Sequence, residues 1–333
     1  MWRRDKRPTG TEAPMDEEAQ RAARQAIWLS QLYARNWMFI TPEVQAALQR
    51  KVLFAAGVGG ASHIVTLACR TGLTKFIVAD DDTVETTNLN RQAYQVEHLD
   101  QNKAAALADI LRSISPDVQV EVMRGKINEQ NYMDGIARSD FVINSIDFEQ
   151  PAFLLLNRVA QAAGKTVLLP LNLGWIGVLL VFTPESPTLD QFLGIRTGQV
   201  GGLDVASRLI ERVVTGLPPS GQQYLAEPLK QFAKRDKAWP GDPQLGAAVY
   251  ATAALAARVI VAATANEPVR VVPEVVYADL FGQVTPGETT AGASQPAAAP
   301  PKSDLSISTN ASDQGGDVAS TPDDLEDEEQ KAS

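Results

Sequence analysis

The sequence predicts an α/β fold: a Rossmann-like, doubly wound, mainly parallel sheet with flanking helices, and a smaller C-terminal crossover and strand region. Three observations support this prediction. Residues 52–56, 76–79 and 141–144 form short apolar runs, which suit strands that are covered on both faces. Helical patterns separate these runs, as βαβ units require. A glycine-rich turn at 57–60 directly follows the first run.

The first half of the chain alternates between predicted helices and strands. Residues 17–36 show apolar positions at helical spacing, and Thr41 with Pro42 marks the start of a second helix that runs to about Gln49. The 57–60 turn is followed by a helix at 61–71. Further helices are expected at 103–114, 128–136 and 153–163, and further strands at 118–122 and 164–170.

The second half is less regular. We expect a strand at 175–182, an irregular segment at 184–243 with one helical piece at 206–214, a helix at 245–265 and short strands at 269–280. Residues 1–16 are predicted to be a flexible leader, 17–183 the nucleotide-binding core, and 184–283 a crossover segment, long helix and strands that complete the same domain. Residues 284–333 have almost no large apolar side chains and are predicted to be a disordered acidic tail.

Charge and composition exclude several classes of function. The net charge is −10, of which residues 284–333 contribute −8, so a nucleic-acid partner is not expected. Cys69 is the only cysteine, which excludes an internal disulfide and a cysteine-based zinc site. The charged N-terminus lacks an apolar core, and Arg258 interrupts the apolar 245–265 run. We therefore expect a cytoplasmic protein without a membrane span.

The 57–60 turn is the first candidate binding feature. Gly57, Gly59 and Gly60 allow a tight turn and a close backbone approach to phosphate oxygens, although Ser62 stands at the sixth position of the glycine fingerprint. Asp80 ends the next strand, from which a carboxylate can reach ribose hydroxyls. A packing turn and an exposed turn acid are the alternative interpretations of these two features.

Polar residues beyond Asp80 indicate that the protein carries out chemistry on the phosphates in addition to binding them. Asn88, Arg91 and Lys103 form a polar trio that a plain dehydrogenase does not need. Asp147 follows the 141–144 strand, where a carboxylate could hold magnesium against the phosphates. A simple loop acid is the alternative for Asp147.

These segments together resemble the ThiF/MoeB family, the adenylyltransferases that are related to ubiquitin-activating enzymes. The resemblance is carried by Tyr-Ala-Arg-Asn at 33–36, the 57–60 glycine turn, Asp-Asp-Asp-Thr-Val at 80–84, Asn-Leu-Asn-Arg-Gln at 88–92, Lys103 and Asp147. It covers residues 28–183 well and 244–280 loosely. The 82–92 segment is highly specific for the family, and the glycine turn is much less so.

The resemblance implies ATP- and magnesium-dependent adenylation of the C-terminal carboxylate of a ubiquitin-like protein, sulfur carrier or peptide by a homodimer. The residues implied to contact the nucleotide are Gly57, Gly59, Gly60, Asp80, Asp82, Asn88, Arg91 and Lys103. Asp147 is implied to bind magnesium. Arg35 resembles the family's arginine finger, which enters the partner's site, so Arg35, Arg91, Lys103 and Asp147 are the candidate catalytic residues.

The sequence also departs from the family pattern. Phe148 and Ala152 replace the usual Asn and Arg after Asp147, and the paired Cys-x-x-Cys zinc motifs are absent, so no zinc is expected. The 184–243 segment contains no cysteine, which predicts adenylation without an enzyme thioester. Two alternatives stay open: a catalytically degenerate scaffold that binds nucleotide or a partner, and an NAD-dependent oxidoreductase.

Overall fold

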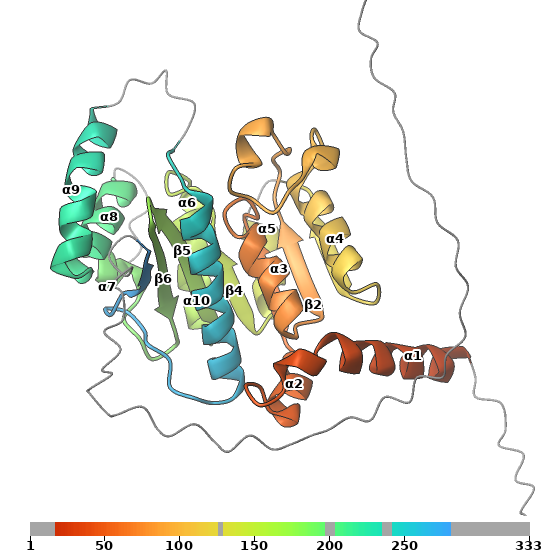
Figure 1. Cartoon of the computed structure of the whole chain (residues 1–333). Helices are drawn as coiled ribbons and strands as arrows, with labels where there is room; N and C mark the ends of the chain where they lie inside the picture. Colours follow the sequence, from red (N-terminus) through yellow and green to blue (C-terminus); the bar gives the residue numbers. More distant parts are fainter. Residues whose placement is uncertain (1–16, 126–128, 197–203, 235–241, 281–333) are drawn as a thin grey trace, which may run out of the picture. The chain divides into compact units, whose positions relative to one another are not determined.

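The computed structural model describes residues 17–125, 129–196, 204–234 and 242–280 (Figure 1). The predicted leader at 1–16 and the acidic tail at 284–333 lie outside the described residues.

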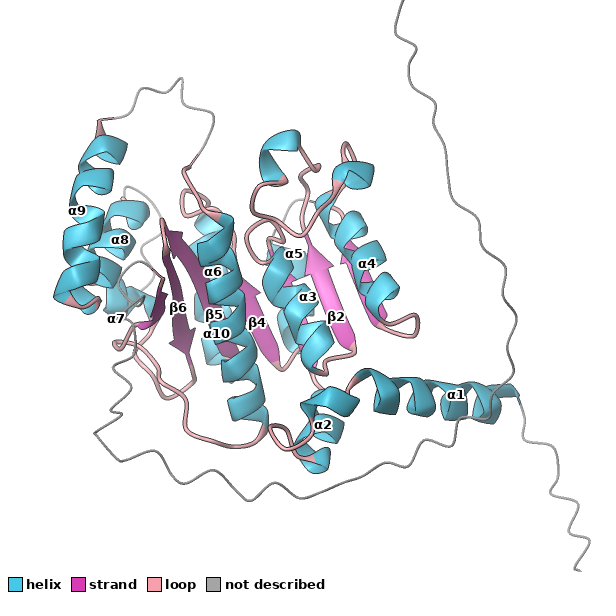
Figure 2. Cartoon of the chain, in the orientation of Figure 1, coloured by secondary structure: helices cyan, strands magenta, loops and turns pink. Residues whose placement is uncertain are grey.

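One seven-stranded sheet forms the centre of the fold, with the strand order β3-β2-β1-β4-β5-β6-β7 (Figure 2). Strands β1 to β5 are parallel to one another, whereas β6 pairs antiparallel with both β5 and β7. The strands are β1 Val52–Ala56, β2 Lys75–Ala79, β3 Gln119–Met123, β4 Phe141–Asn144, β5 Thr166–Leu173, β6 Ile176–Phe182 and β7 Val276–Asp279. This mainly parallel sheet confirms the predicted fold class.

Helices cover both faces of the sheet and divide the apolar core into two layers. One layer packs α3, α4 and α10 against the sheet, and the other packs α5 to α9 against the opposite face. The α-helices are α1 Glu17–Leu32, α2 Pro42–Leu48, α3 Ser62–Thr71, α4 Lys103–Ile114, α5 Glu129–Ala137, α6 Pro151–Ala162, α7 Leu189–Leu193, α8 Val205–Gly216, α9 Pro219–Ala233 and α10 Gly246–Thr264. Short 3₁₀ helices occupy η1 Ala34–Asn36, η2 Thr86–Asn88 and η3 Val96–His98.

The segment predicted to be irregular contains more helix than expected. Besides α8, which matches the predicted piece at 206–214, it forms α7 and the 15-residue α9. Pro228 lies inside α9 and suggests a helix break from sequence alone. Tertiary packing overrides that signal, because α9 buries Gly221 and Leu225 against the second core layer.

Helix α10 is a core element. It lies against α3, β5 and β6, and Gly177 of β6 allows its backbone to come close: a Cβ at that position would lie 2.7 Å from the carbonyl oxygen of Ala248. By length and composition α10 alone among the described helices could cross a membrane, but half of its apolar window is buried within the fold. Its contacts with the sheet account for that apolar character.

The strand order reverses direction at the pair β1 and β4. From β1 the chain moves outward to β2 and β3, and it then returns to add β4 on the other side of β1. In open α/β sheets the crevice at such a switch point, beyond the carboxyl ends of the strands, is where ligands bind. The 57–60 turn lies at this point.

Candidate functional site

The glycine turn that follows β1 is shaped by its contact with the end of β4. Gly57 has a φ angle of +81°, and a Cβ there would lie 2.3 Å from the backbone oxygen of Ser145, so only glycine fits. Within the described part of the chain, the backbone N–H groups of Gly59, Gly60 and Ala61 donate to no other group. These amides, at the start of α3, form a ready site for an anion.

Asp80 joins the glycine turn to β2. One carboxylate oxygen accepts a hydrogen bond from Val58 N at 2.7 Å, and the other accepts from Asp82 N at 3.0 Å. The residue is only 7 % exposed, and burial raises the pKa of its carboxyl against the opposing effect of these two N–H donors. Asp80 therefore lies at the carboxyl edge of the sheet beside the turn, and its ribose-binding role stays a prediction.

Ser62, the departure from the glycine fingerprint, connects two of the predicted motifs. Its buried hydroxyl donates to Gly59 O at 2.8 Å and accepts from Ala93 N at 3.0 Å. A glycine at this position could make neither bond. Ser62 thus couples the phosphate turn to the loop that carries residues 88–92.

Arg91 is held in that loop with part of its guanidinium unpaired. Its Nη1 donates to Thr87 O at 2.7 Å and to Asn90 Oδ1 at 3.0 Å, whereas its buried Nε has no hydrogen-bond partner. Burial lowers the pKa of Arg91, and the negative charge of Asp242 partly opposes this effect. A desolvated guanidinium with a spare donor is suited to a phosphate.

Asn88 and Lys103 have defined partners in the structure. Asn88 Oδ1 accepts from Glu85 N at 3.0 Å and so helps to fix η2. The buried Lys103 ammonium lies 2.9 Å from Asp82 Oδ2, which is on an exposed side chain. Asn88 therefore has a visible structural role, and Lys103 is held at the carboxyl edge by Asp82.

Asp147 follows β4 on the same edge and is exposed; Gln150 Nε2 donates to its Oδ2 at 3.3 Å. Phe148 packs edge-to-face on Phe153, with ring centroids 5.2 Å apart, and Ala152 packs against the second core layer. The two departures beside Asp147 thus serve the apolar core.

Arg35 lies away from this constellation. Tyr33 Oη donates to Cys69 O at 2.8 Å and Asn36 Nδ2 donates to Thr71 O at 3.1 Å, which fixes η1 at the C-terminal end of α3. The glycine turn is at the other end of this ten-residue helix, about 15 Å away at 1.5 Å per residue. The exposed Arg35 side chain is therefore remote from the glycine turn of its own chain.

The structure adds site residues that sequence reasoning missed. Tyr94 Oη lies 2.9 Å from Val58 O and 3.2 Å from Lys103 O, and so ties the glycine turn to α4. Ser145 and Asn172, at the ends of β4 and β5, lie near Gly60. Only the position of Ser145 and Asn172 after predicted strands could have suggested them from sequence.

The predicted residues around the turn form one connected group that can hold a polyanion. Hydrogen bonds and ion pairs join the glycine turn, Asp80, Asp82, Lys103 and the 88–93 loop, and Asn90 connects that loop to the start of α10 through Gln244 O at 3.4 Å. The orange loop that follows β2 and the first turn of α10 accordingly lie at the same edge of the sheet in Figure 1. Free amides, a guanidinium and an ammonium suit phosphates, and the oxygen ligands of Asp147 suit a magnesium ion.

Solved structures share the fold of this chain. A PaaA structure covers 82 % of this chain and 82 % of its own, with a TM-score of 0.53 and 17 % identity. An Escherichia coli MccB structure with MccA-N7isoASN covers 80 % and 76 %, with a TM-score of 0.54 and 15 % identity. At these identities the likeness concerns the fold alone.

Curated relatives are similar to part of this chain. The SAMP-activating enzyme E1 of Haloferax volcanii is 35 % identical over 158 residues, and the sulfur carrier protein ThiS adenylyltransferase of Escherichia coli is 28 % identical over 142 residues. These matches cover 44 % and 42 % of this chain, and 55 % and 56 % of the relatives. The chain therefore spans about half the length of these relatives. The ThiF family model matches residues 33–285, most of the chain, and the chain belongs to the ThiF family.

Proposed function

We propose that this protein adenylates the C-terminal carboxylate of a ubiquitin-like protein, a sulfur carrier or a peptide with ATP. The observation that carries the proposal is the connection of three free turn amides, at Gly59, Gly60 and Ala61, to Asp80 and to the Arg91 loop by hydrogen bonds. Relatives named as adenylyltransferases and activating enzymes support it.

In the proposed reaction a carboxylate oxygen of the acceptor attacks the α-phosphorus of ATP. The bond from that phosphorus to the bridging oxygen breaks, pyrophosphate leaves with the electron pair, and an acyl-adenylate forms. Asp80 accepts hydrogen bonds from the ribose, and the turn amides bind phosphate oxygens. Arg91 and Lys103 are fixed cations beside the phosphates and stabilise the charge that develops in the transition state.

Magnesium would be held by Asp147 and would supply positive charge against the phosphates. The carboxylate of Asp147 is exposed at the carboxyl edge, two residues after Ser145, whose backbone contacts Gly57. Its oxygens are ligands of the kind that magnesium prefers.

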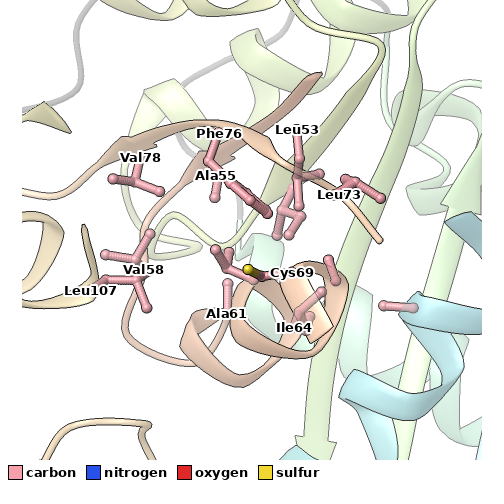
Figure 3. Close-up of a cluster of buried hydrophobic side chains, with 14 of the residues drawn as sticks. Leu53, Ala55, Val58, Ala61, Ile64, Cys69, Leu73, Phe76, Val78 and Leu107 are labelled. Carbon is pink, nitrogen blue, oxygen red and sulfur yellow. The ribbon is translucent and has the colours of Figure 1, made fainter. Parts of the chain in front are cut away.

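We further propose that the acyl-adenylate passes to an external nucleophile, without an enzyme thioester. Cys69 is fully buried in α3, and its sulfur points among the apolar side chains of the first core layer (Figure 3). Burial raises the pKa of its thiol to about 12, so the thiolate is scarce at neutral pH.

A homodimer would bring Arg35 to a second site. Arg35 is remote from the glycine turn of its own chain, and beside it three large apolar side chains are exposed: Trp37 at 68 %, Met38 at 78 % and Phe39 at 89 %. Such a patch is typical of an association surface. We propose that it packs on a second copy, so that Arg35 enters the partner's site as an arginine finger.

The test of the proposed function is Mg-ATP binding by calorimetry, followed by ATP–pyrophosphate exchange with ThiS and MccA as first probe acceptors. Arg91→Ala and Asp147→Ala are expected to abolish exchange. Arg112→Ala and Asp109→Ala are matched controls on the exposed face of α4, where their weak ion pair contributes little to stability. Full exchange in both site variants would count heavily against the proposal.

Two outcomes would favour the alternatives. Mg-ATP binding without exchange for any acceptor would support the degenerate scaffold, for which the apolar Phe148 and Ala152 are the favouring observation. Tight NADH binding without ATP binding would support the oxidoreductase, which leaves the desolvated Arg91 unexplained.

Mixed dimers test the role of Arg35. Purified Arg35→Ala and Asp147→Ala proteins, each expected to be inactive alone, would be mixed and allowed to exchange subunits. Transfer of Arg35 between protomers predicts about one quarter of wild-type exchange activity, because half of the dimers are mixed and each has one complete site. No recovery, with sedimentation showing mixed dimers, would show that Arg35 does not act across the interface.

A further inference from the structure

Two polar side chains at the ends of neighbouring strands face the glycine turn from the side opposite Asp80. A Cβ built on Gly60 would lie 3.7 Å from Ser145 Oγ and 4.0 Å from Asn172 Nδ2. The space above Gly60 is therefore bounded by a hydroxyl and an amide, and not by apolar groups. Neither group donates a hydrogen bond within the described residues, although each is half-buried.

The side-chain amide of Asn172 is oriented by α10. The hydroxyl of Thr252 has one proton and three acceptors within reach: Asn172 Oδ1 at 2.9 Å, Ala248 O at 3.0 Å and Leu171 O at 3.3 Å. Asn172 Oδ1 is the nearest of the three. With its oxygen held by Thr252, the amide of Asn172 presents its N–H₂ group to Gly60. This orientation depends on Gly177, which allows the backbone of α10 to approach β6, because a Cβ there would lie 2.8 Å from Thr252 Oγ1.

The order of groups along the sheet edge suggests which part of a bound nucleotide lies beside Ser145 and Asn172. Asp80 follows β2, the glycine turn follows β1, Ser145 follows β4 and Asn172 lies in the last residues of β5, and these four strands are neighbours in that order. A nucleotide with its ribose at Asp80 and its first phosphate at the turn extends its phosphates toward β4 and β5. Uncharged N–H and O–H donors there suit phosphate oxygens.

We propose that Asn172 and Ser145 bind a phosphate oxygen of the nucleotide, with Thr252 as a positioning residue that fixes the amide of Asn172. This inference rests on the proposed function and adds a further side of the phosphate site, at the ends of β4 and β5. It gives β5 a phosphate-binding residue and α10 a positioning residue. Neither element contributes any of the residues that sequence reasoning selected.

The test is calorimetric titration of the full chain with Mg-AMPCPP, AMP and adenosine. Asn172→Ala is expected to weaken Mg-AMPCPP binding about tenfold, as for a lost hydrogen bond to a charged group, and to leave adenosine binding unchanged. Ser145→Ala is expected to weaken Mg-AMPCPP binding by a smaller factor. The melting temperature of each variant checks that the fold is retained.

Thr252 offers a matched pair. Thr252→Val keeps the shape but removes the hydroxyl, and it is expected to weaken Mg-AMPCPP binding severalfold. Thr252→Ser keeps the hydroxyl and is expected to retain wild-type affinity. A merely structural role of Thr252 would lower the affinity for adenosine as much as for Mg-AMPCPP.

The outcomes separate this inference from the proposed function. The phosphate contact is refuted, and the proposed function stands, in either of two cases. In the first, Asn172→Ala binds Mg-AMPCPP as tightly as wild type does. In the second, its affinity for adenosine falls by the same factor as its affinity for Mg-AMPCPP. If the wild-type protein binds none of the phosphorylated probes, the proposed function fails and takes this inference with it. AMP reports which phosphate is involved, because a loss seen with AMP as well assigns the contact to the α-phosphate.

Discussion

Replacing Ser62 by alanine should uncouple the glycine turn from the loop that carries Arg91. The hydroxyl of Ser62 accepts from Ala93 N at 3.0 Å and donates to Gly59 O at 2.8 Å, and no water can replace it because the residue is fully buried. A buried donor that loses its acceptor costs about 1–3 kcal/mol. Because Ala93 is only half-buried, the expected loss in the free energy of unfolding is about 1–2 kcal/mol.

Urea unfolding of the full chain, followed by circular dichroism, measures this loss. Ser113→Ala is the matched control, since its hydroxyl donates to Ile110 O on the exposed face of α4, and a change within about 0.5 kcal/mol is expected there. Calorimetry of Ser62→Ala with Mg-AMPCPP should also show weaker binding, because the Arg91 loop is no longer fixed to the turn. If Ser62→Ala unfolds at the same urea concentration as wild type, the coupling role of Ser62 is refuted.

Three further predictions concern the turn, the cysteine and a histidine. Gly57→Ala should lower the free energy of unfolding by more than about 3 kcal/mol, since it adds a collision with Ser145 O to the cost of a positive φ. Gly164 has a φ of +76° and open space around it, so Gly164→Ala should lower the free energy of unfolding by only about 1 kcal/mol in the same urea assay. Cys69 in the native protein should resist iodoacetamide at pH 8 and react fully in urea, as mass spectrometry would show; rapid native labelling would contradict the burial of its thiol. Burial lowers the pKa of His63 below 6.5, so its contribution to stability is present above pH 6.5 and is lost as the pH falls through the lowered pKa; an NMR ring titration with an inflection at or above 6.5 would contradict this.

Local sequence signals predicted the parallel half of the sheet because they report burial directly. The apolar runs of β1 and β4 are almost wholly buried, and the turn and acid that follow β1 and β2 are where the strand ends place them. The N-cap of α2 was equally predictable: Thr41 Oγ1 accepts from Val44 N, with Pro42 at the first helical position. These features depend on contacts within a few residues, or on strand ends that share one edge.

The features that sequence reasoning missed depend on contacts between distant elements. Pro228 suggests a break in α9, yet packing of that helix on the second core layer keeps it intact. Asn172 lies in a strand with no motif around it, and only the antiparallel register of β5 with β6, together with the approach of α10 at Gly177, places its amide beside Thr252. No pattern in a single sequence predicts how β5 pairs with β6.

The division between predicted and missed residues follows the topology of the sheet. The recognised motifs at the site lie on β1, on β2 and in the loops after β2 and β4. These elements form the nucleotide side of the switch point. The acceptor must reach the α-phosphorus from another direction, and β5 with the start of α10 borders that side. If members of the family differ mainly in the carboxylate they activate, their differences should be concentrated in β5, α9 and α10. The departures at Phe148 and Ala152, which precede and begin the helix leading to β5, lie at the beginning of this region.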